Sequence, residues 1–387
     1  MNNPTLFIFA GENSGDLHGS LLMAALRQLT PTLQFIGVGG QRMRTEGMEC
    51  ILPMEEFQVM GFSDVLRSFP KLFKHFYTVR DYILKSKPEA VILIDYPGFN
   101  LRLAKALRKK GFKGKIIQYI CPSVWAYGKK RIPQMANSLD LLLTIFPFET
   151  EYFSQTSLKV TYVGNPITEI LQKHQYRNEW QQELKIQPSD EIIAIFPGSR
   201  ENEINRNFPK QLEAAKMLKN HGPKIRFGIS VANDELLPLL EYHIQKSGLR
   251  PGHDVALIPL QYRYELMRDC RTAIAKSGTI TLELALHQTP TVVVYELSAF
   301  NRFIAKYFLK LNLPHYCIVN ILAEGMIFPE LIATKFTPQM LYQHVKALDA
   351  PGFYRDACKA SCLHLKNVLK SDEPSKKAAS AILELLQ

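Results

Sequence analysis

Short apolar runs alternate with longer segments in which apolar residues recur at helical spacing. Parallel strands buried on both faces read as continuous apolar runs, and the helices that connect them show the longer period. In the first half of the chain this pattern predicts strands at 5–10, 33–38, 90–95, 115–121 and 140–146. In the second half it predicts strands at 191–196, 224–230, 254–259, 272–276 and 291–295.

The repeated strand–helix order predicts an α/β protein with two doubly wound, Rossmann-like domains that face a cleft. A chain of 387 residues exceeds what one hydrophobic core usually organises. Asn165 and Pro166 separate the halves, so we expect domains at 1–165 and 166–355. Residues 356–387 should form helices that close the fold, and a return to the N-terminal domain is one outcome that the spacing leaves open.

The charge changes the set of expected partners. Lys and Arg number 47 against 36 Asp and Glu, a net charge of +11, which favours nucleic acid, an anionic membrane or a phosphorylated substrate. A merely basic protein without such a partner is the alternative. The N-terminus lacks the pattern of a signal peptide, and no run approaches the roughly 20 apolar residues that span a bilayer.

The cysteines and histidines show no metal-binding pattern. The 6 cysteines are scattered without a Cys-x-x-Cys pair, and the 10 histidines include no His-Glu-x-x-His. The sequence therefore predicts free thiols in a reducing, cytoplasmic compartment, with no metal and no cofactor.

The first predicted strand ends in a glycine-rich turn, Gly11-Glu-Asn-Ser-Gly-Asp-Leu-His-Gly19. Glu12, Ser14 and Asp16 would line the crevice at the end of this strand, where α/β folds bind ligands. The spacing is not Gly-x-Gly-x-x-Gly, so it gives little support to dinucleotide binding. A tight strand-to-helix connection without a ligand is the alternative.

Asp95 ends a strongly apolar strand, and Tyr-Pro-Gly-Phe-Asn100 follows it. A carboxylate at this place costs desolvation unless it has a partner or a function. We interpret Asp95 as a candidate general base and Asn100 as a helper or a ligand of sugar hydroxyls. An aspartate that only caps the next helix is the alternative.

Two turns in the second half combine features that bind a nucleoside diphosphate. One follows a strand and supplies backbone N–H groups, a hydroxyl and a guanidinium. The other opens a helix, with a carboxylate one turn later that could accept bonds from ribose hydroxyls. The candidate residues are Gly198, Ser199, Arg200, Ser277, Gly278, Thr279 and Glu283. Each turn alone is also compatible with an ordinary helix start.

Two basic segments with aromatic stripes, 299–313 and 69–84, are typical of helices that lie in a membrane interface. A stripe that faces the protein core is the alternative. The candidate membrane contacts are Phe300, Arg302, Phe303, Lys306, Tyr307 and Phe308. Near the predicted strand at 115–121, Ser123 and Trp125 are candidates for the acceptor side of a site.

The order of several motifs resembles that of the lipid-A-disaccharide synthase family. The motifs include Gly11-Glu-x-Ser-Gly-Asp, Asp95-x-Pro-x-Phe-Asn100, Pro122-Ser-Val-Trp-Ala126, Pro147-Phe-Glu149, Pro197-Gly-Ser-Arg-x-x-Glu203, Ser277-Gly-Thr-x-x-Leu-Glu283 and Asn320-Ile-Leu-Ala. They extend from residue 11 to residue 323. The resemblance implies the glycosyltransferase B fold and an inverting transfer that requires no metal.

In the reaction that the resemblance implies, UDP-2,3-diacylglucosamine donates its sugar to the 6-hydroxyl of 2,3-diacylglucosamine 1-phosphate. The products are a β-1′,6-linked disaccharide 1-phosphate and UDP. The resemblance also implies a peripheral protein on the cytoplasmic face of the inner membrane, without nucleic acid as a partner. The sequence leaves a homodimer open.

The resemblance assigns roles to the candidates already named. Asp95 would deprotonate the acceptor hydroxyl, and Glu12, Ser14 and Asp16 would assist it or position the acceptor. The turns at Arg200 and at 277–279 would stabilise the departing diphosphate. Glu283 would hold the ribose, and Asn320 would face the cleft.

The chain departs from the usual family pattern at four positions. Gly98 stands where Asp is common, Asn165 where His is usual, Cys121 where Ser is common and Tyr127 where Trp is common. The departures at Gly98 and Asn165 affect the expected acid–base chemistry. The alternatives are a UDP-sugar epimerase or a lipid-linked N-acetylglucosaminyltransferase of the same fold, or a non-enzymatic protein that binds anionic lipid.

Overall fold

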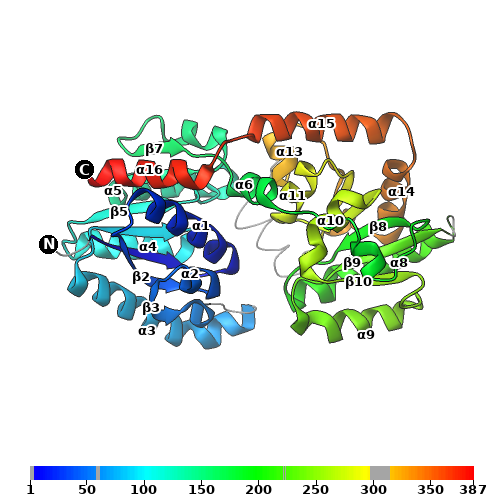
Figure 1. Cartoon of the computed structure of the whole chain (residues 1–387), viewed down its shortest axis with the longest axis horizontal. Helices are drawn as coiled ribbons and strands as arrows, with labels where there is room; N and C mark the ends of the chain where they lie inside the picture. Colours follow the sequence, from blue (N-terminus) through cyan, green and yellow to red (C-terminus); the bar gives the residue numbers. More distant parts are fainter. Residues whose placement is uncertain (1–3, 58–61, 221, 223, 297–313) are drawn as a thin grey trace. The chain divides into compact units, whose positions relative to one another are not determined.

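The computed structural model describes residues 4–57, 62–220, 222, 224–296 and 314–387 (Figure 1). The chain forms two compact units. The first contains Met1–Lys173 and Leu369–Gln387, and the second contains His174–Val368. Helix α6 (Pro166–Lys173) belongs to the first unit, so the division falls after this helix rather than before it.

The first unit is built on a parallel sheet of 7 strands in the order β3-β2-β1-β4-β5-β6-β7. The strands are β1 (Thr5–Ala10), β2 (Gln34–Gly39), β3 (Glu49–Pro53), β4 (Ala90–Ile94), β5 (Lys115–Tyr119), β6 (Leu141–Thr144) and β7 (Lys159–Tyr162). The order reverses between β1 and β4, whose residues pair in register from Leu6 with Ala90 to Ala10 with Ile94. This reversal creates a switch point, where parallel sheets bind ligands at the carboxyl ends of their strands.

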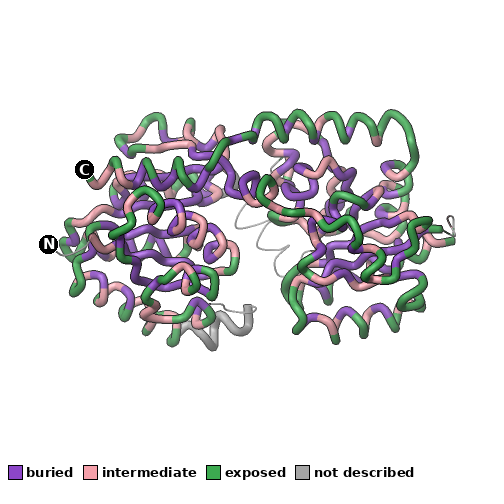
Figure 2. The backbone as a smooth tube through the Cα atoms, viewed as in Figure 1, coloured by how far each residue is buried: buried purple, intermediate pink, exposed green. Residues whose placement is uncertain are grey.

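Successive side chains of each strand point to opposite faces of this sheet, where they pack into two separate cores. Leu6 and Ile8 pack on one face with helices α1 (Asn13–Leu29) and α16 (Pro374–Leu386). Phe7 and Phe9 pack on the other face with α3 (Phe62–Ser86), α4 (Pro97–Lys109) and α5 (Ile132–Ser138). Because both faces are covered, the central strands are buried along almost their whole length (Figure 2).

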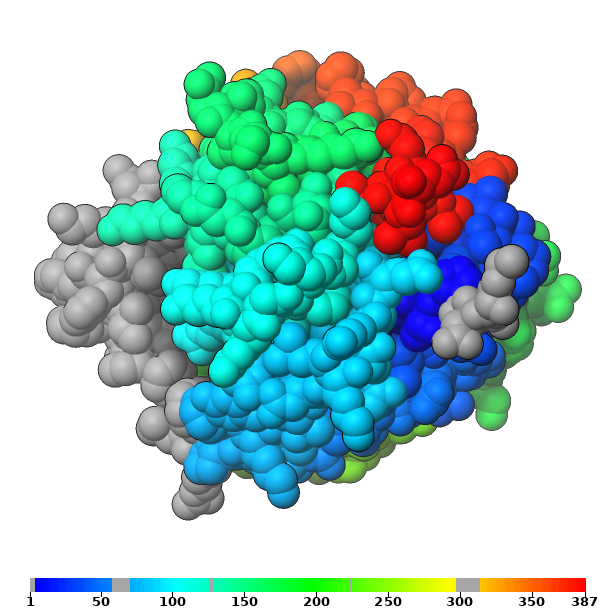
Figure 3. Space-filling view, turned by 90° about the vertical axis from the view of Figure 1, so that its left-hand side faces the viewer, coloured from blue at the N-terminus to red at the C-terminus, as the bar shows by residue number. Residues whose placement is uncertain are grey.

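The last helix returns the chain to the first unit. Helix α16, drawn in red, packs on α1 beside segments drawn in blue (Figure 3). Its residues Ala378, Ala379 and Ile382 are buried in the same core as the first strand. Burying one side chain the size of isoleucine contributes roughly 1.5–3 kcal/mol to the free energy of unfolding. Helix α16 therefore stabilises the first unit, although the other residues of that unit are far from it in the sequence.

The second unit repeats the same strand order, β10-β9-β8-β11-β12-β13, and its 6 strands are also parallel. They are β8 (Glu191–Phe196), β9 (Ile225–Ser230), β10 (Val255–Ile258), β11 (Thr272–Lys276), β12 (Thr291–Tyr295) and β13 (Glu330–Ile332). The switch point of this sheet lies between β8 and β11.

Most of the remaining helices lie between these strands. In the first unit, α2 (Gln41–Thr45) lies between β2 and β3. In the second unit the helices are α7 (Trp180–Glu183), α8 (Glu201–Lys219), α9 (Leu237–Ser247), α10 (Arg263–Asp269), α11 (Ile280–Leu286), α13 (Ile318–Leu322), α14 (Pro338–Asp349) and α15 (Phe353–Leu369). Helix α8 packs beside α9 and α14, whereas α10 contacts β8 and β9 and α11 contacts β11 and β12.

The structure confirms the predicted fold class, and each predicted strand is present. The pattern missed β3, β7 and β13, which are all short. Strands β3 and β7 are the edge strands of the first sheet and are only partly buried. Because one side of an edge strand faces solvent, polar residues interrupt its apolar run and weaken the signal in the sequence.

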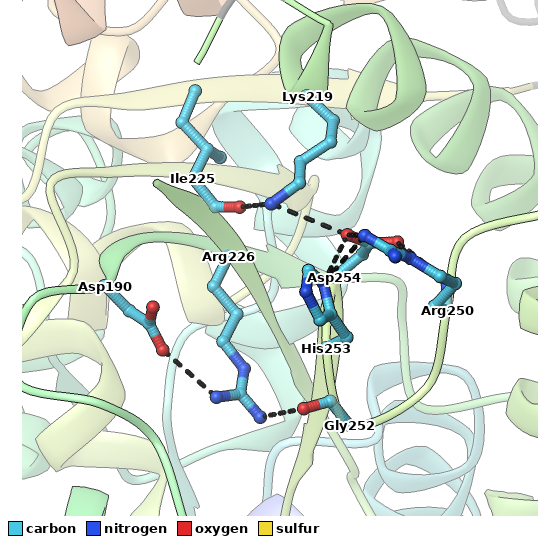
Figure 4. Close-up of polar contacts among 8 residues, drawn as sticks. All are labelled: Asp190, Lys219, Ile225, Arg226, Arg250, Gly252, His253 and Asp254. Carbon is cyan, nitrogen blue, oxygen red and sulfur yellow. Dashed lines mark hydrogen bonds and ion pairs between the residues drawn. The ribbon is translucent and has the colours of Figure 1, made fainter. Parts of the chain in front are cut away.

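A network of charged side chains fixes the turn before β10 (Figure 4). The buried carboxylate of Asp254 accepts hydrogen bonds from the guanidinium and the backbone N–H of Arg250. Lys219 lies 3.5 Å from the same carboxylate. Beside it, Arg226 on β9 donates to the carbonyl oxygen of Gly252, 2.8 Å away. The hydrogen bond with Arg250 is the largest reason why the pKa of Asp254 lies far below its ordinary value.

We predict that Asp254→Asn lowers the free energy of unfolding near pH 7 by on the order of 2 kcal/mol, because charge-assisted hydrogen bonds are lost. The wild-type protein should lose this contribution as the pH falls below about 4, where the unfolded carboxylate takes up a proton first. The difference between the two proteins should therefore shrink in acid. Urea unfolding at several pH values measures it, with exposed Asp234→Asn as the control; a constant difference down to pH 2 would contradict the assignment.

Candidate functional site

A pocket of about 530 Å³ lies in the first unit, where β1 and β4 end. Two carboxylates, Glu12 and Asp95, contribute to its lining, and most of the other lining groups are apolar or aromatic. The further lining residues that matter for its chemistry are Leu72, Phe73, Phe76, Gly98, Phe99 and Arg102. The structure thus brings together two of the candidate catalytic residues, next to an apolar wall that comes from α3 and the start of α4.

The backbone that carries Asp95 is strained. Asp95 and Tyr96 have φ angles of 48° and 43°, a left-handed conformation that residues other than glycine rarely adopt. Such a residue costs of order 1–3 kcal/mol unless the surrounding structure holds it. Two buried amides supply this support: Asn100 Nδ2 and Gln118 Nε2 donate to the Asp95 carbonyl oxygen at 2.6 and 3.1 Å.

Aromatic packing fixes the other side of the same turn. A side chain at Gly11 would come within 3.0 Å of the Tyr96 ring, so the glycine permits this close approach. The Tyr96 hydroxyl donates to the carbonyl oxygen of Phe57. Phe99 stacks on Phe9 with ring centroids 4.5 Å apart. The pocket wall is therefore anchored in the core of the sheet.

The environment of Asp95 suits a general base. Burial, with a smaller contribution from the negative charge of Glu12, raises the pKa of Asp95 to about 6. A base with a pKa close to the working pH is largely deprotonated and still accepts a proton readily.

The amide nitrogen of Asn100 donates to the carbonyl oxygens of Ile94 and Asp95 rather than into the pocket. Its place favours a role in positioning Asp95.

Asp16 has a different environment from the other two carboxylates. It is 4% exposed, and its oxygens accept hydrogen bonds from the backbone N–H groups of Gly40, Arg42 and Met43 at 2.7–3.1 Å. These N–H groups lie at the start of α2, where the first N–H groups of a helix have no acceptor within the helix itself. The geometry therefore favours a structural role for Asp16, which joins α1 to the start of α2, over a role in catalysis.

Ser14, Ser123 and Trp125 lie near the same edge of the sheet, but within the described part of the chain they are not among the residues that line this pocket. Ser14 is in the first turn of α1, and the other two follow β5. The Trp125 ring packs edge-on against Phe148, with centroids 6.0 Å apart.

Burial raises the pKa of the Glu149 carboxyl to about 8, although hydrogen bonds from the N–H groups of Phe146 and Ile145 act in the opposite direction.

In the second unit, the turns after β8 and β11 meet at the switch point. Gly198 has φ +127°, and Arg200 begins helix α8 as its N-cap residue. The carboxylate of Glu203, in the first turn of α8, accepts from the N–H of Ser199 and pairs with Lys276 at the end of β11. The structure therefore brings the two predicted turns together around this one carboxylate.

Part of the backbone of the turn at residues 277–279 is hydrogen-bonded within the fold itself. The N–H of Ser277 donates to the carbonyl oxygen of Val294, whereas Gly278 and Thr279 are exposed. Glu283 is buried, and its Oε2 lies 3.6 Å from Arg263 Nε without a hydrogen-bond partner among the described residues. Burial raises the pKa of Glu283, and the charge of Arg263 lowers it. A carboxylate in this state can accept hydrogen bonds from a ligand.

Two buried asparagines, Asn320 of a family motif and Asn165 at a position where His is usual, serve the fold. Asn320 is fully buried: its side chain accepts from the N–H groups of Ile327 and Phe328 and donates to Glu330. Its hydrogen bonds oppose the expectation that it faces a ligand. Asn165 accepts from the N–H of Ile167 and so caps α6.

The structure describes only one of the two expected membrane segments. Residues 299–313, with their candidates Phe300, Arg302, Phe303, Lys306, Tyr307 and Phe308, lie outside the described residues. In α3, Leu72 and Phe76 pack against the core, whereas Phe73 is 53% exposed. Of the helices that the structure describes, none combines the length and the apolar character needed to cross a bilayer.

Several site residues were not identified from the sequence pattern. Gln118 lies inside an ordinary strand signal, so its sequence context does not distinguish it, and Phe99 stands in the motif at 95–100 without a signal of its own. Arg102 is one of many surface cations. Glu203 and Lys276 stand within or beside the motifs, yet their pairing depends on the adjacency of β8 and β11. Among the described residues, no group of three or more His, Cys, Asp or Glu side chains could hold a metal ion.

Two parallel sheets with the same strand order, each with polar groups at its switch point, define a two-domain α/β protein with the glycosyltransferase B fold. The fold is similar to a putative UDP-N-acetylglucosamine 2-epimerase from Listeria monocytogenes, with a TM-score of 0.63 and 12% identity over 99% of this chain and 95% of that one. It is also similar to CalG4, the calicheamicin glycosyltransferase, with a TM-score of 0.59, 12% identity and coverage of 100% and 99%.

The chain belongs to the lipid-A-disaccharide synthetase family, whose model matches residues 6–383. It is 40% identical over 372 residues to the lipid-A-disaccharide synthase of Chlamydia pneumoniae, which covers 95% of this chain. It is 33% identical over 385 residues to that of Geobacter metallireducens, which covers 99% of this chain. The chain spans 60% of the length of the Chlamydia pneumoniae relative and 98% of the Geobacter metallireducens relative.

We predict that Asp95 titrates with a pKa of about 6 and that Glu12→Gln lowers this value. Removing the negative charge of Glu12 makes the ionised form of Asp95 less unfavourable. Because burial is the larger cause, the pKa should stay above that of an ordinary aspartate. ¹³C NMR titration of aspartate-labelled protein measures it, with Asp95→Asn to assign the signal. Exposed Glu151→Gln is the charge-matched control, and an equal shift in both variants would contradict the role of Glu12.

Proposed function

We propose that the protein is an inverting glycosyltransferase that joins two acylated glucosamines, as the names of its relatives indicate. UDP-2,3-diacylglucosamine would donate its sugar to the 6-hydroxyl of 2,3-diacylglucosamine 1-phosphate. The observation that carries this proposal is the pocket in which Asp95 and Glu12 adjoin a wall of aromatic side chains. A sugar that bears acyl chains needs both a polar site for its hydroxyl groups and an apolar surface.

Asp95 is the general base of the proposed reaction. It takes the proton of the acceptor 6-hydroxyl while that oxygen bonds to carbon 1 of the donor sugar. The bond from carbon 1 to the diphosphate oxygen breaks, and its electron pair leaves with UDP. Asn100 and Gln118 hold the Asp95 backbone in its left-handed conformation, so the carboxylate is preorganised for this transfer.

The second unit binds UDP in this proposal. The N–H groups at the start of α8, which has 19 residues, and the guanidinium of Arg200 would stabilise the negative charge that develops on the diphosphate. Ser277, Gly278 and Thr279 would contact the same groups from the neighbouring strand. Glu283 would accept hydrogen bonds from the ribose hydroxyls, which offsets the cost of its burial.

The apolar wall of the first-unit pocket would hold an acyl chain of the acceptor. Phe99 and Phe76 form the inner part, with ring centroids 5.4 Å apart, and the half-exposed Phe73 lies toward solvent. Since both substrates carry acyl chains and the chain is strongly basic, we also propose that the protein acts at an anionic membrane surface, on the cytoplasmic side. The exposed part of α3 and residues 299–313 are the segments proposed to contact it.

A test of the proposal supplies purified protein with both acylated substrates in detergent micelles and EDTA. Release of UDP that depends on the acceptor, together with a disaccharide 1-phosphate in the mass spectrum, is the expected result. Release of UDP without any disaccharide would show hydrolysis and overturn the proposal, whereas conversion of a non-acylated UDP-sugar into another UDP-sugar would favour an epimerase. Binding of anionic vesicles without turnover of either substrate would favour a lipid-binding protein and overturn the proposal.

We predict that Asp95→Asn lowers turnover at least about a hundredfold, which is the usual contribution of a general base, and leaves UDP affinity unchanged. The amide keeps the size of the side chain but cannot accept the proton. Steady-state kinetics and UDP titration measure the two effects, with exposed Asp81→Asn on α3 as the matched control. Near-normal turnover of the folded variant would remove Asp95 from the role of base.

We predict that Phe73→Gln raises the acceptor KM about threefold to tenfold and that the effect grows with acyl length, because each methylene buried on the ring is worth about 0.8 kcal/mol. Phe73 is 53% exposed, so the substitution should not affect folding. Acceptors with short and long acyl chains provide the measurement. Phe353→Gln on α15, where the side chain is 82% exposed, is the control. A KM that does not change with acyl length would place the chain elsewhere.

A further inference from the structure

Lys276 occupies an unusual place for a lysine. It is the last residue of β11, and its side chain is only 16% exposed. Its Nζ lies 2.8 Å from Glu203 Oε1 and 5.0 Å from the centroid of the Tyr295 ring on the next strand. A lysine side chain gives up hydration and rotational freedom when it is held this way. The structure therefore points its ammonium group at the turn that carries Ser199 and Arg200.

Glu203 connects this lysine to the predicted diphosphate site. Its Oε1 contacts Lys276 and lies 3.6 Å from Arg200 Nη1. Its Oε2 accepts the N–H of Ser199 at 3.3 Å. One carboxylate thus contacts an ammonium, a guanidinium and a backbone N–H at the start of a long helix. This is the combination of donors that binds a phosphate group in proteins.

The surrounding backbone leaves room for that anion. A side chain at Gly198 would come within 2.9 Å of Glu203 Oε2, and the φ of +127° at this position is one that glycine adopts without strain. The two cations, Arg200 and Lys276, outnumber the one carboxylate. The cluster therefore keeps a net positive charge even with Glu203 ionised.

We propose that Lys276 is a diphosphate-binding residue of the donor site, and that Glu203 occupies the position that a phosphate group takes when UDP binds. This inference rests on the proposed function of the second unit. The phosphate replaces the Glu203 carboxylate as the partner of Lys276, Arg200 and the Ser199 N–H. Lys276 then stabilises the charge on the departing UDP. Glu203 keeps both cations in place and competes with the incoming diphosphate.

UDP and uridine binding by isothermal titration calorimetry tests the inference, because uridine lacks the phosphates. Lys276→Met should weaken UDP binding at least tenfold and leave uridine binding unchanged. Lys276→Arg, which keeps the charge, should bind UDP within about threefold of the wild-type protein. Glu203→Gln should bind UDP more tightly, since the competing charge is lost. Lys246→Met on the exposed face of α9 removes one positive charge outside the site and should have no effect.

The outcomes separate this inference from the proposed function. If the wild-type protein fails to bind UDP, the proposed function fails and this inference fails with it. If the wild-type protein binds UDP but Lys276→Met binds it equally well, only the role of Lys276 is overturned. An equal loss of UDP and uridine affinity would show that Lys276 supports the pocket without contacting phosphate. Weaker UDP binding by Glu203→Gln would overturn the exchange of carboxylate for phosphate.

Discussion

Because right-handed crossovers place successive helices on one face of a parallel sheet, a chain that covers both faces must once reverse the direction in which it adds strands. In the first unit this reversal separates β1 from β4, and in the second it separates β8 from β11. The loops at such a point diverge to opposite faces and leave a crevice between them. Glu12 and Asp95 line a pocket at the first switch point, and Ser199 and Lys276 lie at the second switch point.

The two switch points have opposite electrostatic character, although the sheets that form them share one strand order. The first contains two carboxylates beside aromatic rings, which favours a raised pKa and an apolar ligand. The second gathers Arg200 and Lys276 around one carboxylate and a helix start, which favours a phosphorylated ligand. The fold determines where ligands can bind, and the side chains at the strand ends determine which ligands bind there.

The polar residues singled out from the sequence divide into two groups that the sequence does not separate. Asp95 and Glu12 line a pocket, whereas Asp16, Asn165 and Asn320 accept hydrogen bonds from backbone N–H groups that helix starts and turns leave unpaired. Each of the second group is buried. A buried polar side chain is costly without partners, so hydrogen bonds accepted from the backbone account for the burial of these side-chain oxygens without a ligand.

The sequence by itself determined most of the strands, their parallel arrangement and the turns that carry the chemistry, because apolar runs and glycine-rich turns are local signals. It placed the ends of β1, β4, β8 and β11 within a few residues. Only the tertiary structure decided which strand ends are neighbours, and hence that Gln118 supports Asp95 and that Glu203 meets Lys276. It also decided that α16 packs on α1. These contacts join residues far apart in the chain, and their geometry depends on packing that no local pattern encodes.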